Sequence, residues 1–251
     1  RYWEKITFRK FDGKNEFPLS GLPEEGKIRL YRWSPDGTKL AVVVYLPKTI
    51  ELWVADVQTG KATRWASNLH DALVYNPIDW APDSKSIVYT GRILSREGLA
   101  FSDKLPEGPS VQESTGRATR VRTFQDLLQN PIDEHKFEHY GTSAIMLAEE
   151  GKDPIELGNP GLFLNFSISP NGEYILVQQL MRPFSYIVPF NRFPIWIDIW
   201  SADGRLIKKL AEIPLSESIP QGFNAVRTGP RGHQWRADKP ATIVWVEAQD
   251  E

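Results

Sequence analysis

Residues 27–65 alternate strand-like runs with short polar turns. The run at 39–45 is rich in valine, as in a buried strand, and the run at 50–56 alternates apolar and polar positions. Between the first two runs, the segment Ser34-Pro35-Asp36-Gly37 favours a tight turn, because proline presets φ and glycine accepts a positive φ. Four short antiparallel strands joined by turns are typical of one blade of a β-propeller.

The pattern recurs, as it should for a unit that cannot bury both of its faces alone. Residues 80–84 and 168–172 repeat the pattern of residues 33–37, and residues 235–239 are a degraded copy. Each copy follows one apolar run and precedes another. The sequence therefore predicts an all-β chain of four-stranded antiparallel blades, a partial and unclosed β-propeller, with unrelated hairpins in a β-sandwich as the alternative. The residues expected near the ends of innermost strands are Trp33, Trp80, Ile168 and Trp235.

One partial propeller domain is expected over residues 1–251, with units at about 5–20, 27–66, 74–158, 161–212 and 223–251. The first and last units lack strands, and such ends would leave exposed sheet edges. The chain is therefore expected to be a fragment of a larger propeller. It starts at Arg1 without a methionine or a signal segment, which predicts a processed product or a piece of something longer.

A helical insertion interrupts the third unit at residues 92–141, between its second and third strands. Residues 123–128 are predicted to form a helix capped by Thr123, which Pro131 interrupts. Residues 132–140 are predicted to form a second helix, capped by Asp133. Residues 181–194 loop out at the same place in the next unit. Both loops should project from one face, where binding sites usually lie.

Composition narrows the function classes. The chain has 251 residues, a formal net charge of −2 and no cysteine. No strong attraction to nucleic acid is indicated, and neither a disulfide nor a thiolate metal site is possible. No apolar run reaches the roughly 18 residues of a membrane span. No cofactor is expected.

Three segments carry a resemblance to a known family: residues 123–131, residues 182–194, and residues 225–230 with 235–238. Together with the repeated turns, they resemble the N-terminal propeller of a prolyl oligopeptidase-type serine peptidase. The resemblance is closest to the glutamyl endopeptidases of chloroplasts and their bacterial relatives. It implies a periplasmic, secreted or plastid location, a peptide substrate, and an α/β-hydrolase domain of the same protein as partner.

In that family, the catalytic serine, aspartate and histidine belong to the hydrolase domain. The present chain contains no G-x-S-x-G nucleophile elbow, so it carries no candidate catalytic residue and should be inactive by itself. The resemblance implies a propeller that filters access to a peptide-binding cavity and lines part of it.

Arg182 and Arg192 bracket the aromatic, proline-rich loop on the favoured face. A peptidase that prefers glutamate needs a cation at the side-chain pocket, and arginine pairs bidentately with carboxylates. We therefore predict a substrate-binding role for Arg182 and Arg192, with Tyr186 as a hydrogen-bond donor. The alternative is that both arginines fix the loop structurally.

Other polar groups are weaker candidates. His135 and His139 are four positions apart on a predicted helix, but the H-E-x-x-H order is absent, which favours a solvated helix face over a zinc site. A basic cluster and two pairs of glutamates are best explained as solvated charge at loops and turns; these are Arg117, Arg120 and Arg122, Glu24 with Glu25, and Glu149 with Glu150.

Two other functions compete with the peptidase interpretation. The first is a periplasmic scaffold propeller that binds proteins without enzymatic activity. The second is a propeller with its own hydrolytic site, such as a glycosidase, which would need carboxylates converging at the central channel. The first strands of the predicted units show no such set of carboxylates.

Overall fold

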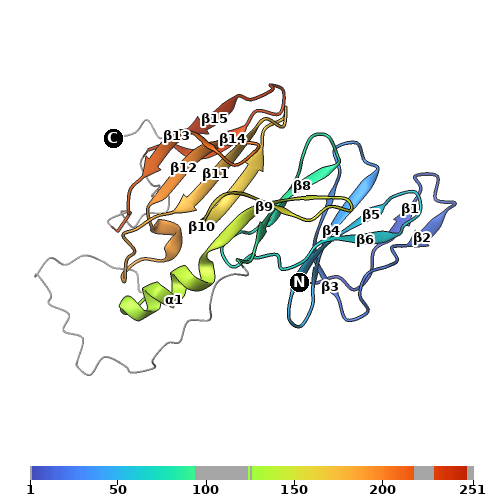
Figure 1. Ribbon diagram of the computed structural model, residues 1–251, viewed down its shortest axis with the longest axis horizontal. Helices are drawn as coiled ribbons and strands as arrows, with labels where there is room; N and C mark the ends of the chain where they lie inside the picture. Colours follow the sequence, from blue (N-terminus) through green and yellow to red (C-terminus); the bar gives the residue numbers. More distant parts are fainter. Residues whose placement is uncertain (1, 94–123, 125, 218–228, 248–251) are drawn as a thin grey trace, which may run out of the picture.

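The computed structural model describes residues 2–93, 124, 126–217 and 229–247 (Figure 1). Strands dominate it, and all pairings between its named strands are antiparallel. The elements are β1 (Thr7–Arg9), β2 (Glu16–Pro18), β3 (Lys27–Trp33), β4 (Lys39–Tyr45), β5 (Ile50–Asp56), β6 (Ala62–Ala66), β7 (Ile78–Trp80), β8 (Ser86–Gly91), α1 (Pro131–Gly141), β9 (Ser143–Glu149), β10 (Ile155–Ile168), β11 (Tyr174–Leu180), the 3-10 helix η1 (Phe190–Arg192), β12 (Ile195–Ser201), β13 (Leu206–Ile213), β14 (Arg231–Trp235) and β15 (Ile243–Val246). The all-β prediction with a helical insertion is confirmed.

The first complete unit is the four-stranded sheet β3-β4-β5-β6. Its second strand, β4, is the valine-rich run, and its central residues are buried on both faces of the sheet. The predicted turn before β4 is present. Gly37 has a φ of +71° and donates its backbone N–H to the Ser34 carbonyl at 2.9 Å, while the Ser34 hydroxyl donates to Asp36 at 2.7 Å. Local turn chemistry therefore fixes the register of this unit.

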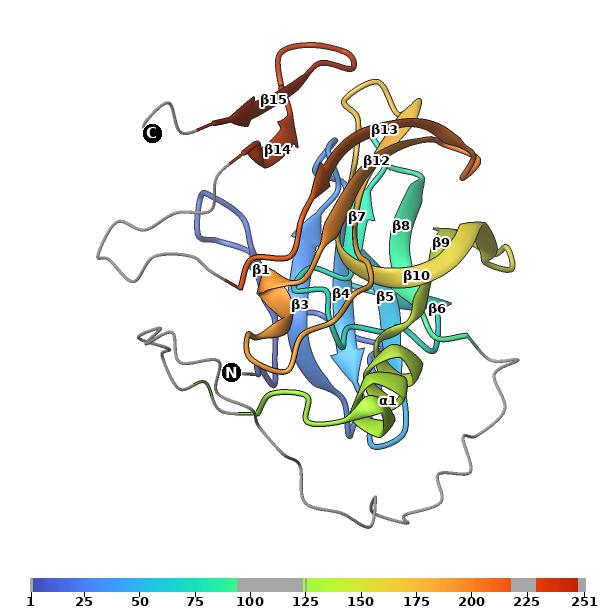
Figure 2. The same cartoon turned by 90° about the vertical axis from the view of Figure 1, so that its left-hand side faces the viewer.

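A seven-stranded sheet in the order β13-β12-β11-β10-β9-β8-β7 contains the next two units. The two units share β10, whose first part pairs with β9 and whose second part pairs with β11 (Figure 1). The sequence predicts a unit ending near residue 158 and another beginning near residue 161, but the strand runs through this boundary without a turn. Gly158, with a φ of +67°, lies at an irregularity in the pairing with β9, and the pairing partner changes to β11 between Gly161 and Leu162. Figure 2 shows the resulting curved sheet from its side.

Neighbouring units are joined by a hydrogen bond that recurs at equivalent positions. Trp80 ends β7, and its indole N–H donates to the Arg32 carbonyl at the end of β3 at 3.1 Å. Trp235 ends β14, and its indole donates to the Ser167 carbonyl near the end of β10 at 3.0 Å. Trp33 and Ile168 occupy the same place in the two preceding units. Each indole therefore bonds the carbonyl of the residue just before that place. The repeated tryptophan is a joint between units, which explains its place in the repeat.

At the joint between the other two units, the corresponding residue is Ile168, which has no indole to donate. Here the backbone N–H of Ile168 donates to Oδ2 of Asp79 at 2.9 Å, and Asp79 directly precedes Trp80. Burial raises the pKa of Asp79 to about 6, although this hydrogen bond and the nearby Arg32 charge act in the opposite direction. A carboxyl group therefore replaces the missing tryptophan at this joint.

Aromatic and aliphatic side chains fill the space between the two large sheets. Trp65 and Trp80 meet edge to face there, with ring centres 5.7 Å apart. The hairpin β1-β2 covers the other side of the first unit, where Phe8 packs near Phe17 and Trp33. The buried residues between the sheets are Ala41, Val43, Leu52, Val54, Trp65, Ala66, Leu69, Ile78, Trp80, Ile87, Tyr89 and Ala148.

The insertion contributes one helix to the described residues, not two. The prediction of a helix at residues 123–128 is wrong for Phe124 and for residues 126–128, which are not helical, while Thr123 lies outside the described residues. Pro131 does not interrupt a helix but begins α1, because a proline at the first helical position loses no hydrogen bond. The cap is Asn130, not Asp133, since the Asn130 side chain accepts the backbone N–H of Asp133 at 3.0 Å.

Candidate functional site

Helix α1 and residues 181–194 lie together at one end of the curved sheet (Figures 1 and 2). Both belong to connections between the second and third strands of a unit. The prediction that the insertion and this loop project from one face is confirmed for the part of the insertion that the structure describes. Three phenylalanines connect them. The Phe137 ring on α1 stands edge to face against Phe184 at 5.3 Å and against Phe193 at 6.0 Å, while Phe184 and Phe193 stack at 5.2 Å.

Arg182 adds a polar connection beside this aromatic cluster. Its Nε and Nη2 donate to the two carboxylate oxygens of Glu138, each at 2.8 Å, and its Nη1 donates to Glu134 at 2.5 Å. The two glutamates are four positions apart on α1 and therefore lie on one face of the helix. The guanidinium also lies 4.6 Å from the centre of the Phe184 ring. All three guanidinium nitrogen atoms of Arg182 thus bond to the insertion.

Tyr186 joins the same group of side chains. Its hydroxyl bonds to Glu134, and this contact raises the pKa of Tyr186. The hydrogen bonds from Arg182 and Tyr186 lower the pKa of Glu134, so the carboxylate is held in its charged form. The structure therefore brings Arg182 and Tyr186 together on one glutamate.

Arg192, the third predicted site residue, lies at the far end of the loop. Its guanidinium carbon is 5.2 Å from the ring centre of Phe124, and its backbone carbonyl accepts the N–H of Ser216 at 3.0 Å. The loop consequently presents two separate guanidinium groups, one bound to helix α1 and one beside the residues that precede it.

The weaker candidates do not converge on a site. Within the ranges that the structure describes, no group of three or more histidine, cysteine, aspartate or glutamate side chains could hold a metal ion. The His139 ring lies against Tyr140, and Glu149 pairs with Lys152 at the turn after β9. Arg117, Arg120 and Arg122 lie outside the described residues. No described helix is long and apolar enough to cross a membrane.

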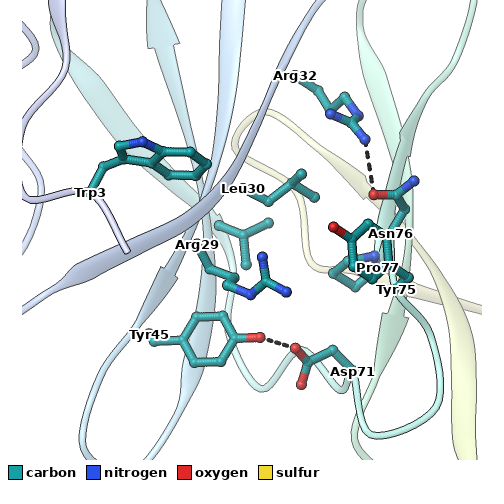
Figure 3. A pocket seen from close by; sticks show the side chains of 10 residues that line it. Trp3, Arg29, Leu30, Arg32, Tyr45, Asp71, Tyr75, Asn76 and Pro77 are labelled. Carbon is teal, nitrogen blue, oxygen red and sulfur yellow. Dashed lines mark hydrogen bonds between the residues drawn. The ribbon is translucent and has the colours of Figure 1, made fainter. Parts of the chain in front are cut away.

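A cavity elsewhere in the structure was not predicted from the sequence. It has a volume of about 150 Å³ and lies between β3 and the segment at residues 71–77 (Figure 3). One wall is polar: the Tyr45 hydroxyl donates to Asp71, and burial raises the pKa of that carboxyl group. Arg32 donates to the side chain of Asn76 at 2.9 Å. The lining residues are Trp3, Arg29, Leu30, Arg32, Val43, Tyr45, Asp71, Tyr75, Asn76 and Pro77.

Comparison with known proteins gives sequence relatives over almost the whole chain. It is 35% identical over 241 residues to a probable glutamyl endopeptidase, chloroplastic, of Oryza sativa subsp. japonica, a match covering 92% of this chain and 26% of that protein. It is 38% identical over 245 residues to the protein of the same description from Arabidopsis thaliana, covering 94% of this chain and 25% of that protein. The chain therefore spans about a quarter of the length of these curated relatives. No protein-family model matches it.

The chain is also similar to several solved structures. Pyrococcus horikoshii acylaminoacyl peptidase has 20% identity and a TM-score of 0.47, covering 83% of this chain and 28% of that chain. The β-propeller domain of the Trilobed protease from Pyrococcus furiosus has 13% identity and a TM-score of 0.44, covering 98% of this chain and 60% of that chain. The sequence relatives confirm the resemblance that the loop segments predicted.

Proposed function

Because this chain is related to the glutamyl endopeptidases over more than nine tenths of its length, we propose that it is the non-catalytic propeller portion of a serine endopeptidase. In this role it limits access to a peptide-binding cavity and lines part of it. The sequence relationship is the observation that carries the proposal. The absence of a G-x-S-x-G segment from the 251 residues agrees with a chain that supplies no nucleophile. The partner is an α/β-hydrolase domain of the same protein.

The end formed by α1 and residues 181–194 is the proposed substrate-facing surface. Long loops on a rigid scaffold commonly carry binding residues, and here two loops from neighbouring units are fixed to each other. The Phe137, Phe184 and Phe193 contacts and the bidentate pair between Arg182 and Glu138 hold the surface in one arrangement. Such a surface can exclude large substrates without moving.

We assign the preference for acidic peptides to Arg192 and to the group formed by Arg182 and Tyr186. Glu138 holds Arg182 through two hydrogen bonds, whereas Glu134 takes only one of its nitrogen atoms. A substrate carboxylate could replace Glu134 on Arg182 and accept from the Tyr186 hydroxyl without detaching the loop from α1. Arg192 offers a second cation at the other end of the same loop.

Kinetics on paired peptides test this assignment. In the full-length protein that contains this chain, we expect Arg182→Ala or Arg192→Ala to lower kcat/KM for a glutamate peptide by roughly 10- to 100-fold, and to affect the glutamine analogue much less. Arg236→Ala is the matched control, because Arg236 pairs with Asp238 in the turn between β14 and β15, away from this loop. If both variants lose cleavage of the two peptides equally, or lose neither, the arginines serve only the structure of the loop.

A further inference from the structure

The cavity between β3 and residues 71–77 is lined by two guanidinium groups and one carboxyl group. The carboxyl group, Asp71, already accepts a hydrogen bond from Tyr45. One of the guanidinium groups, Arg32, donates to Asn76 and to a neighbouring backbone carbonyl. The charge of the lining is therefore net positive, and most of its polar groups have partners within the protein.

Arg29 is the exception. Its guanidinium carbon lies 5.7 Å from the centre of the Tyr75 ring, but within the described part of the chain it donates no hydrogen bond and forms no ion pair. Figure 3 shows this guanidinium between the Tyr45 and Tyr75 rings, with no dashed line reaching it. Its charge acts on the nearby Asp71 carboxyl group, whose pKa it lowers against the larger effect of burial. A half-buried arginine without a hydrogen-bonded partner among the described residues is suited to bidentate binding of an anion.

The shape and surroundings of the cavity restrict the anion. A volume of about 150 Å³ corresponds to several water molecules at roughly 30 Å³ each, which fits a short acidic side chain. Trp3 and Tyr75 are 46% and 79% exposed at its rim and offer apolar contact to the methylene groups of such a side chain. β3 is the edge strand of its sheet, but its outer edge is occupied next to the cavity: Ile28 exchanges two backbone hydrogen bonds with Trp3, and the Arg32 carbonyl accepts from Trp80. The cavity therefore recognises a side chain rather than a peptide backbone.

We propose that this cavity binds the carboxylate of an acidic side chain in a peptide, with Arg29 as the bidentate donor and Arg32 as a second positive charge at the rim. The site lies on the first strand of a unit, apart from helix α1 and residues 181–194. It would recognise an acidic residue of the peptide other than one held by Arg182 or Arg192. The peptide as ligand rests on the proposed function, whereas the carboxylate selectivity rests on the cavity alone.

Binding of a blocked peptide to the full-length protein tests the proposal. The probe is acetyl-Glu-Ala-Ala-Glu-Ala-amide, whose two glutamates allow one to reach the cavity while the other lies at Arg182 or Arg192. It is titrated by calorimetry after treatment with a serine-directed fluorophosphonate, and the reference is the peptide with both glutamates replaced by glutamine. We expect Arg29→Gln to weaken binding of the glutamate peptide by about 10- to 100-fold and to leave the glutamine peptide within about twofold. Arg29→Lys keeps the charge but not the planar fork, so its loss should be intermediate.

Arg205→Gln is the matched control, since Arg205 pairs with Asp203 at an exposed turn in another unit, and it should change neither affinity. Unchanged melting temperatures verify that the variants fold. Equal affinities of Arg29→Gln and unchanged protein for the glutamate peptide would overturn the proposal. Binding that depends on Arg29 in a protein that hydrolyses no peptide would support the cavity and contradict the proposed function instead.

Discussion

Replacing Gly204 by alanine is expected to lower the free energy of unfolding by roughly 2–5 kcal/mol. Gly204 forms the turn between β12 and β13 with a φ of +86°, a conformation that costs a side chain about 1–2 kcal/mol. An added Cβ would also lie 2.2 Å from the Gly158 nitrogen and 2.6 Å from the Leu157 carbonyl carbon. These are backbone atoms of β10 at the junction between two units, so they cannot rotate away.

Gly37→Ala is the matched control for this variant. Gly37 ends a turn with the same Ser-x-Asp-Gly pattern, between the first and second strands of the first complete unit, with a φ of +71°, and an added Cβ would have nothing within 4 Å. This substitution should cost only the conformational strain of about 1–2 kcal/mol. Urea unfolding of the two variants measures the difference. Equal losses for Gly37→Ala and Gly204→Ala would contradict close contact at the junction.

Asp79→Asn should make the protein more stable than the unchanged chain near neutral pH, by up to about 3 kcal/mol. Burial raises the pKa of Asp79 from 3.8 to about 6 in the folded state. A raised carboxyl pKa means that the contribution of the group to stability is fully present below pH 3.8 and is lost as the pH rises through about 6. Asparagine cannot ionise, yet its carbonyl oxygen can still accept the backbone N–H of Ile168.

Urea unfolding at several pH values between 4 and 8 gives the free energy of unfolding of the variant and of the unchanged protein. The effect is the difference between these two free energies. The difference should be smallest at the acidic end and increase through pH 6. Asp36→Asn is the control of opposite sign, because hydrogen bonds led by that from Ser34 hold the pKa of Asp36 down at about 2. A stability difference for Asp79→Asn that does not change with pH would show that this carboxyl group titrates normally.

The repeated strands could be predicted because their signals are local. A Ser-Pro-Asp-Gly turn requires only its own residues to form, and the valine-rich run at β4 identifies its strand by itself. The continuity of β10 could not be predicted in this way. Gly158 and residues 159–161 look like a turn in sequence, but one strand crosses them, because β10 pairs with β9 up to Gly161 and with β11 from Leu162 onward.

The sequence predicted that the insertion and residues 181–194 lie on one face, but not the contacts between them. Arg182 was identified from its place at the start of an aromatic loop, whereas its partners Glu138 and Glu134 lie 44 and 48 positions earlier. The cavity at Arg29 depends on β3 meeting residues 71–77, and single-sequence patterns carry no signal for such a contact. Helix α1 shows the same limit at short range, since the sequence predicted Asp133 as the cap, whereas the Asn130 side chain caps the helix by accepting the Asp133 N–H.

We propose that this chain serves a serine peptidase whose nucleophile lies elsewhere in the protein. The most direct measurement labels the full-length protein with a serine-directed fluorophosphonate during hydrolysis of a fluorogenic glutamate peptide, and then locates the modified residue by mass spectrometry. We predict loss of activity together with a single labelled serine outside residues 1–251. A labelled serine within residues 1–251, or hydrolysis that persists without labelling, would contradict the claim.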